Sequence, residues 1–79
     1  MTLNEFLAEH DRFFRKTQQH PNKVTLHPAD AADLLLVLKP TEMIYDPHGR
    51  HVIAGTTIYQ SAVQNVGRAS FEIDSLNRR

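Results

Sequence analysis

Histidine is the one residue type with metal-binding and catalytic chemistry that is present in excess, with five copies in 79 residues. His48 and His51 have the His-x-x-His spacing of a metal-binding pair. A helix presents that spacing on one face, but these two positions fall around a predicted turn and strand. Residues three apart on a strand point to opposite faces, which favours an exposed hairpin tip. We expect no bound metal and no cofactor.

The other three histidines fall at positions where a structural or solvated side chain is the simpler interpretation. His10 falls on the apolar stripe of the predicted first helix, which places it at the edge of the core. His20 falls in a polar loop, and His27 lies on the strand face opposite Val24 and Leu26. We therefore expect His20 and His27 to be solvated.

Catalytic motifs are absent from the sequence. Without cysteine, the chain has no disulfide, no thiolate zinc site and no cysteine nucleophile. Ser61 and Ser70 lie outside any Gly-x-Ser-x-Gly motif, and no glycine-rich phosphate loop occurs. Asp30 and Asp33 are about one helical turn apart, but stabilisation of a helix N-terminus explains them more simply than acid–base catalysis. We predict that the protein is not an enzyme.

The charges are balanced and evenly spread. Nine Lys and Arg oppose nine Asp and Glu, and the balance holds in residues 1–40 and in residues 41–79. A nucleic-acid-binding surface would gather basic residues on one face. The basic groups here are small and diluted by acids, which disfavours a nucleic-acid partner: Arg12, Arg15, Lys16, Arg78 and Arg79.

Neither targeting nor subdivision of the chain is indicated. Charges interrupt the first sixteen residues, so they do not form the apolar stretch of a secretory signal. The longest apolar run, Leu34 to Leu38, is far shorter than the ~20 residues that span a bilayer. Because no linker or repeat occurs either, we predict one domain over residues 1–79, a cytoplasmic location and no membrane partner.

Two helices are predicted in the first half. Thr2 and Glu5 have the spacing of a capping box, and apolar residues then recur at helical intervals over residues 3–18. A short strand at 23–27 follows the proline-containing loop. Pro28 then suits the first turn of a helix that reaches about residue 39 and stops at Pro40.

The second half has the pattern of strands. A strand at 42–45 leads into the Asp-Pro-His-Gly turn at 46–49, and a strand at 50–54 returns antiparallel to it. After Gly55 come a strand at 56–60, a loop at 61–67 and an alternating strand at 68–74. This order, α-β-α-β-β-β(-β), predicts an α+β fold with two helices packed on a small, mostly antiparallel sheet.

More apolar surface is present than one sheet face needs. The helix at 28–39 is apolar nearly all round, so we expect it to be covered on more than one side. The first helix adds three phenylalanines. A self-contained core and a protein-binding surface both remain open, and the candidate partner-binding residues are Phe6, Phe13, Phe14, Leu34, Val37 and Leu38.

Several short motifs between residues 22 and 74 resemble the peripheral domain of tailed-phage major capsid proteins. They are the helix start His-Pro-x-Asp at 27–30, the strand Ile-Ala-Gly-Thr-Thr-Ile-Tyr-Gln-Ser at 53–61, and Gly-Arg-Ala at 67–69. Thr56-Thr57 replaces the hydrophobic-Pro pair of that family, and 79 residues leave no room for its spine helix. The resemblance implies a small stand-alone phage or prophage protein in the host cytoplasm.

Together, these observations predict a non-enzymatic phage-type structural or protein-interaction protein, with self-association as one form of that role. The alternative is a small phage-encoded inhibitor that docks on a host defence or regulatory protein. A nucleic-acid binder ranks below both.

Overall fold

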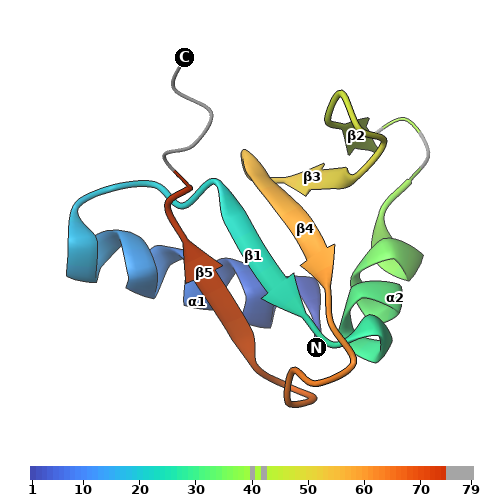
Figure 1. The fold of residues 1–79 in the computed structure, drawn as a ribbon, viewed down its shortest axis with the longest axis horizontal. Helices are drawn as coiled ribbons and strands as arrows, with labels where there is room; N and C mark the ends of the chain where they lie inside the picture. The colour runs from blue at the N-terminus through green and yellow to red at the C-terminus, as the bar shows by residue number, and fades with distance from the viewer. Residues whose placement is uncertain (40, 42, 75–79) are drawn as a thin grey trace.

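The structure is a computed structural model that describes residues 1–39, 41 and 43–74. The strands form one mixed sheet in the order β2-β3-β4-β1-β5, and both helices contribute to a core on one face of it (Figure 1). The predicted α+β class and element order are confirmed. In chain order the elements are α1 (Leu3–Thr17), β1 (Lys23–Leu26), α2 (Pro28–Val37), β2 (Ile44–Tyr45), β3 (His51–Ile53), β4 (Thr56–Gln60) and β5 (Ala69–Glu72).

Helix α1 begins with the predicted capping box. The backbone N–H of Glu5 donates to the Thr2 hydroxyl at 3.1 Å, and the backbone N–H of Thr2 donates to the Glu5 carboxylate at 2.7 Å. At the other end Gln18 adopts a left-handed conformation with φ 61°, and its N–H donates to the Phe14 carbonyl. Local sequence therefore sets both ends of α1.

The two central strands, β1 and β4, are parallel, with Val24 opposite Ile58, while the other neighbouring strands are antiparallel. Parallel neighbours need a long crossover connection. Helix α2 and the β2–β3 hairpin supply it, and they return the chain to the sheet beside β1. The longest strand, β4, therefore lies in the middle of the sheet.

Two tight turns build the hairpins of the second half. The Asp46 carboxylate accepts from the backbone N–H groups of His48 at 2.9 Å and Arg50 at 2.8 Å, which closes the predicted turn. Ala54 and Gly55, with φ 53° and 76°, join β3 to β4 in a two-residue turn of type I′. Strand β4 has its predicted bounds, whereas β1, β3 and β5 are shorter than predicted. Residue 42 of the strand predicted at 42–45 lies outside the described residues.

Helix α2 differs from its prediction in length and in burial. It ends at Val37, two residues early, and is preceded by His27, whose Nδ1 accepts from the Ala29 N–H at 3.0 Å. Leu34 is fully buried, whereas Leu36 is 83% exposed. The expectation of cover on more than one side was wrong, because α2 packs through one face while the opposite face lies against no other described element.

The core lies between the helices and one sheet face. Its buried apolar residues are Phe6, Val24, Leu26, Ala31, Leu34, Ile53 and Ile58. Buried Thr56 joins this layer, and its hydroxyl donates to the Pro21 carbonyl at 3.0 Å. Within residues 1–39, 41 and 43–74, no helix has the length and apolar character needed to cross a membrane.

Candidate functional site

The six predicted partner-binding residues do not form one surface. Phe6 and Leu34 have no exposed area, because they fill the core. These two residues are therefore unavailable to a partner of the folded chain. Leu38 is partly buried and packs against the same core, while Val37 is 58% exposed.

Large apolar side chains outside the predicted set are also exposed. Two of them are Leu36, in the last turn of α2, and Ile44, in the edge strand β2. Helical geometry gave a usable signal for Leu36: two residues, or about 200°, separate it from Leu34, so the two cannot share a buried face. Nothing in the sequence distinguished Ile44 from a buried strand residue.

Phe13 and Phe14 are half-buried, and their rings contact different residues. Phe14 stacks on the exposed His20, with ring centroids 4.4 Å apart and planes at 17°. Phe13 lies 6.1 Å from the ring of Phe71, which is on β5. Phe13 is therefore the predicted residue that borders the sheet edge.

A groove of about 170 Å³ runs between α1 and β5. Its apolar floor is Phe13, Ala69 and Phe71, and its rim carries Glu9, Arg12 and Lys16. In Figure 1 helix α1 passes behind β5 and continues beyond that edge of the sheet. A surface between an edge strand and a projecting helix can accept a further extended segment.

The histidines do not form a metal centre among the described residues, where no group of three or more His, Asp or Glu is placed to hold a metal ion. His48 is exposed beside its turn, and His51 packs its ring on Tyr45 with centroids 4.7 Å apart. His10 is half-buried at the core edge, with its ring 5.8 Å from that of Phe71. Its buried Nε2 has no hydrogen-bond partner among the residues that the structure describes.

His27 is half-buried and caps α2, so the expectation that it is simply solvated was incomplete. Its side chain forms the N-cap of the helix, a position at which Ser or Asp is more common. His20, by contrast, is exposed.

Asp30 and Asp33 line a cleft of about 490 Å³ together with Met1. Asp30 is 1% exposed and accepts from the Gly67 N–H at 2.6 Å, while both carboxylates lie 3.2 Å from the Met1 amino group. These contacts raise the pKa of the Met1 amino group, first through Asp33 and then through Asp30. The acids hold the fold together at this point.

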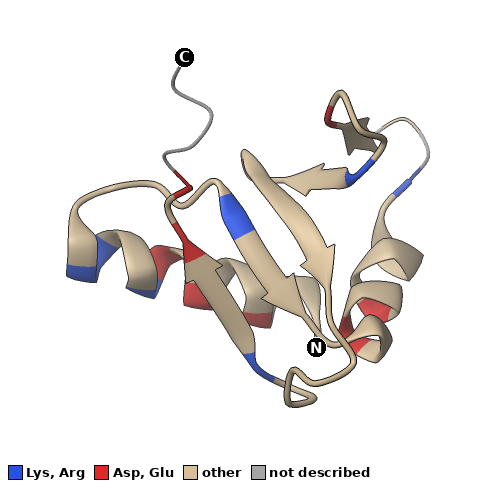
Figure 2. Ribbon diagram, in the orientation of Figure 1, with Lys and Arg blue, Asp and Glu red and all other residues tan. Residues whose placement is uncertain are grey.

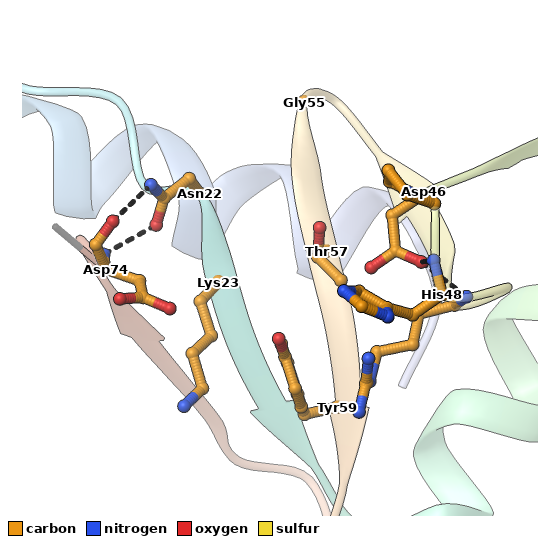
Figure 3. Close-up of a pocket in the computed structure, with 10 residues that line it drawn as sticks. Asn22, Lys23, Asp46, His48, Gly55, Thr57, Tyr59 and Asp74 are labelled. Atoms are coloured by element: carbon orange, nitrogen blue, oxygen red, sulfur yellow. Dashed lines mark hydrogen bonds between the residues drawn. The ribbon is translucent and has the colours of Figure 1, made fainter. Parts of the chain in front are cut away.

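The face of the sheet opposite the helices carries a larger cleft of about 570 Å³ (Figure 3). Tyr59 stands at its centre, with Lys23 Nζ 4.7 Å and Arg50 Cζ 4.5 Å from the ring centroid. Burial would raise the pKa of Asp46, at the rim, but the N–H groups of Arg50 and His48 lower it overall. The sequence analysis did not find this cluster, because its members are far apart in the chain.

Along α1 the acidic residues lie toward the N-terminal end and the basic residues toward the C-terminal end, as Figure 2 shows. Arg15 and Arg12 each pair with an acid on the same helix, Asp11 and Glu9 respectively. The predicted cluster at Arg78 and Arg79 lies outside the described residues.

Comparison of the chain with protein-family models, with curated proteins and with solved structures finds no match. Two surfaces of the described residues are candidate binding sites: the groove beside β5 and the cleft on the open sheet face.

Proposed function

We propose that this chain is a non-enzymatic structural or protein-interaction domain that associates with a second copy of itself through the free edge of β5. The observation that carries the proposal is the self-complementary sequence of β5 and the residue before it, Arg-Ala-Ser-Phe-Glu over residues 68–72. A small residue pairs with a large one, and a basic residue pairs with an acidic one, when the strand meets itself antiparallel.

Among the described residues, no strand pairs with the outer edge of β5. The strand is last in the sheet order and pairs with β1 on one side, Val24 lying opposite Phe71. Backbone N–H and C=O groups on the other side of an edge strand are a template for another strand. Helix α1 covers a face of β5 and projects beyond its edge (Figure 1), so a joining strand would have a surface beneath it.

The pairing that fits best has a two-fold axis at Ser70. Arg68 then lies opposite Glu72 of the second copy, and Ala69 lies opposite its Phe71. Directly opposed residues in an antiparallel pair share a face, so the opposite charges meet on the open face. Each opposite-charge or aromatic cross-strand pair contributes roughly 0.2–1 kcal/mol.

The helix face of the same strand supplies apolar contact. Ala69 and Phe71 line the groove with Phe13, and the small Ala69 side chain leaves room for the phenyl ring of a second copy. Zero formal net charge adds no long-range repulsion between two copies. The groove thus favours a second copy of this chain as its occupant.

Reversal of the paired charges tests this arrangement directly. We expect a dimer by light scattering at high micromolar concentration, a shift toward monomer in Arg68→Glu and in Glu72→Arg, and a recovered dimer in the double variant. Arg15→Glu is the matched control, because Arg15 is 79% exposed on α1 and does not line the groove. A monomer at every concentration, or single reversals that leave the dimer intact, would refute self-association through β5.

A phage or prophage origin belongs to the same proposal, together with a cytoplasmic location in the host. Its support is the resemblance of residues 22–74 to the capsid peripheral domain. A docking inhibitor of a host protein is the competing role. It predicts a monomer that forms a one-to-one complex with its target, so the measurement of mass separates the two roles.

A further inference from the structure

The ring of Phe71, on β5, contacts three rings of α1. The ring centroids of Phe6, His10 and Phe13 lie 5.4, 5.8 and 6.1 Å from that of Phe71. Positions 6, 10 and 13 recur at helical intervals, so the three rings lie on the face of α1 that meets β5. One of the three is an imidazole, and histidine is the side chain whose charge ordinarily changes between pH 5 and pH 8. The packing of α1 on β5 therefore includes an ionisable group.

The surroundings of His10 suit a neutral imidazole. Its ring is half-buried and stands at 87° to that of Phe71, and its buried Nε2 has no hydrogen-bond partner among the described residues. A neutral imidazole has one N–H donor, whereas an imidazolium has two. Proton uptake would place a charge against the apolar ring of Phe71, and a charge buried without a hydrogen-bonded partner is costly. The packed arrangement therefore favours the uncharged form.

A second histidine adds to the cost of that charge. The ring of His20 stacks on Phe14 at 4.4 Å, and its centroid lies 6.1 Å from that of His10. When both imidazoles are protonated, two like charges lie close together, and one of them is half-buried. The chain between α1 and β1, residues 18–22, has no other ionisable side chain.

No carboxylate in the described part of the chain is placed to offset this charge. Neither histidine forms an ion pair with a described acid. Glu9 and Asp11, beside His10 in sequence, pair with arginines of the same helix. Side chains alternate along β5, so Arg68 and Glu72 lie on the face opposite Phe71, and Asp74 lines the cleft on that open face. The side chains one helical turn from His10 are apolar: Phe6, Leu7, Phe13 and Phe14.

From these contacts we infer that His10 is a pH-sensitive switch between α1 and β5, which holds Phe71 while neutral and releases it when protonated. The inference rests on the proposed self-association. In that pairing Phe71 lies opposite Ala69 of the second copy, and it lines the groove that receives the second copy. Helix α1, which forms the other wall of the groove, passes behind β5 in Figure 1. Acidification therefore weakens the interaction surface, and neutral pH restores it.

The size of the response follows from proton linkage. A histidine that takes up a proton only in the released state shifts the equilibrium about tenfold for each pH unit below the ordinary histidine pKa of ~6.5. We therefore expect the dissociation constant of the dimer to rise at least tenfold between pH 7.5 and pH 5.5. Carboxylates ordinarily titrate near pH 4, so the paired charges of the β5 edge persist over this range.

Light scattering at pH 7.5 and pH 5.5, at one ionic strength, measures the response. His10→Phe keeps an aromatic ring without an ionisable nitrogen and should dimerise equally at both pH values, as should His10→Leu. His48→Gln changes an exposed histidine outside the contact, so this control should keep the full response. Equal dimerisation of the native chain at both pH values, or a response that persists in both His10 variants, would overturn the inference.

NMR of a dilute, monomeric sample separates failure of the switch from failure of the proposed self-association. We expect the nuclear Overhauser contacts between the rings of Phe13 and Phe71 to weaken from pH 7.5 to pH 5.5, and to stay constant in His10→Phe. A chain that loses these contacts but is monomeric at every pH would refute the dimer and support the switch. Contacts that are unchanged by pH would overturn the switch, and the same spectra report whether each variant is folded.

Discussion

The carboxylate of Asp30 accepts a hydrogen bond from the backbone N–H of Gly67 across 37 residues of sequence, at 2.6 Å. Its other oxygen lies 3.2 Å from the Met1 amino group, and the side chain is buried. One carboxylate thus connects the start of the chain, α2 and the loop that leads into β5. Asp30 therefore positions the strand that forms the proposed interaction edge.

Removal of this carboxylate should destabilise the fold more than removal of its neighbour. We expect Asp30→Ala to lower the free energy of unfolding by about 3 kcal/mol, because it leaves the Gly67 N–H and the Met1 amino group without their buried partner. Asp33→Ala should lower it by less than about 1 kcal/mol, since Asp33 is 58% exposed. Urea unfolding of both variants measures the difference. Equal losses would show that Asp30 acts only through the helix dipole.

The Met1 amino group should make stability fall at alkaline pH. Hydrogen bonds to Asp33 and Asp30 raise its pKa above the ordinary value of 8.0. Because the pKa is raised in the folded state, the protonated amino group contributes its full stabilisation below pH 8. This stabilisation is lost as the pH rises through the pKa of the folded state. Urea midpoints between pH 7 and pH 10 should decline more steeply for the native chain than for an N-terminally acetylated one. Parallel profiles would contradict this role.

Truncation of two leucines of α2 should affect stability to very different extents. Leu34→Ala should destabilise the protein by about 3 kcal/mol, because the fully buried side chain leaves a cavity. Leu36→Ala should change stability by less than about 0.5 kcal/mol, because Leu36 is 83% exposed. Thermal unfolding of the two variants, at a concentration that keeps the oligomeric state constant, provides the comparison. A large loss in Leu36→Ala would mean that this face is covered in solution.

The turn between β3 and β4 offers a stabilising substitution. Ala54 adopts φ 53° without the freedom of glycine, which costs about 1 kcal/mol. Ala54→Asn creates the Asn-Gly pair preferred in a type I′ turn and should raise the melting temperature by a few degrees. Ala54→Val should lower it, because a β-branched residue is strained in that conformation. A stabilised valine variant would be inconsistent with the turn type.

The elements of the fold were largely predictable, because local chemistry produces them. The Thr2 and Glu5 capping box, the proline at the start of α2 and the Asp46 turn each depend on residues within four positions of one another. The buried and exposed faces of α2 were harder to predict, because an almost wholly apolar helix shows no amphipathic stripe. His27 was also missed as a cap, since an imidazole is an uncommon helix-capping group.

The candidate surfaces also combine residues that the sequence pattern indicated with residues that only the fold brings together. Phe13 belonged to the predicted set and borders the β5 groove, but Phe6 has the same residue type and helical period and lies in the core. Lys23, Arg50 and Tyr59 have no short-range motif in common. They meet because β1 and the chain before β3 lie on either side of β4.

The sequence by itself determined the α+β class, the ends of α1, the hairpin turns, and the balance of charge that leaves recognition to shape and local contacts. The tertiary structure decided which apolar residues remain at the surface, the parallel pairing of β1 with β4, and the free edge of β5. It also brought Lys23, Arg50 and Tyr59 together on the open face. The physical reason is that caps and turns depend on neighbouring backbone groups, whereas strand order and burial depend on contacts between segments far apart in the chain.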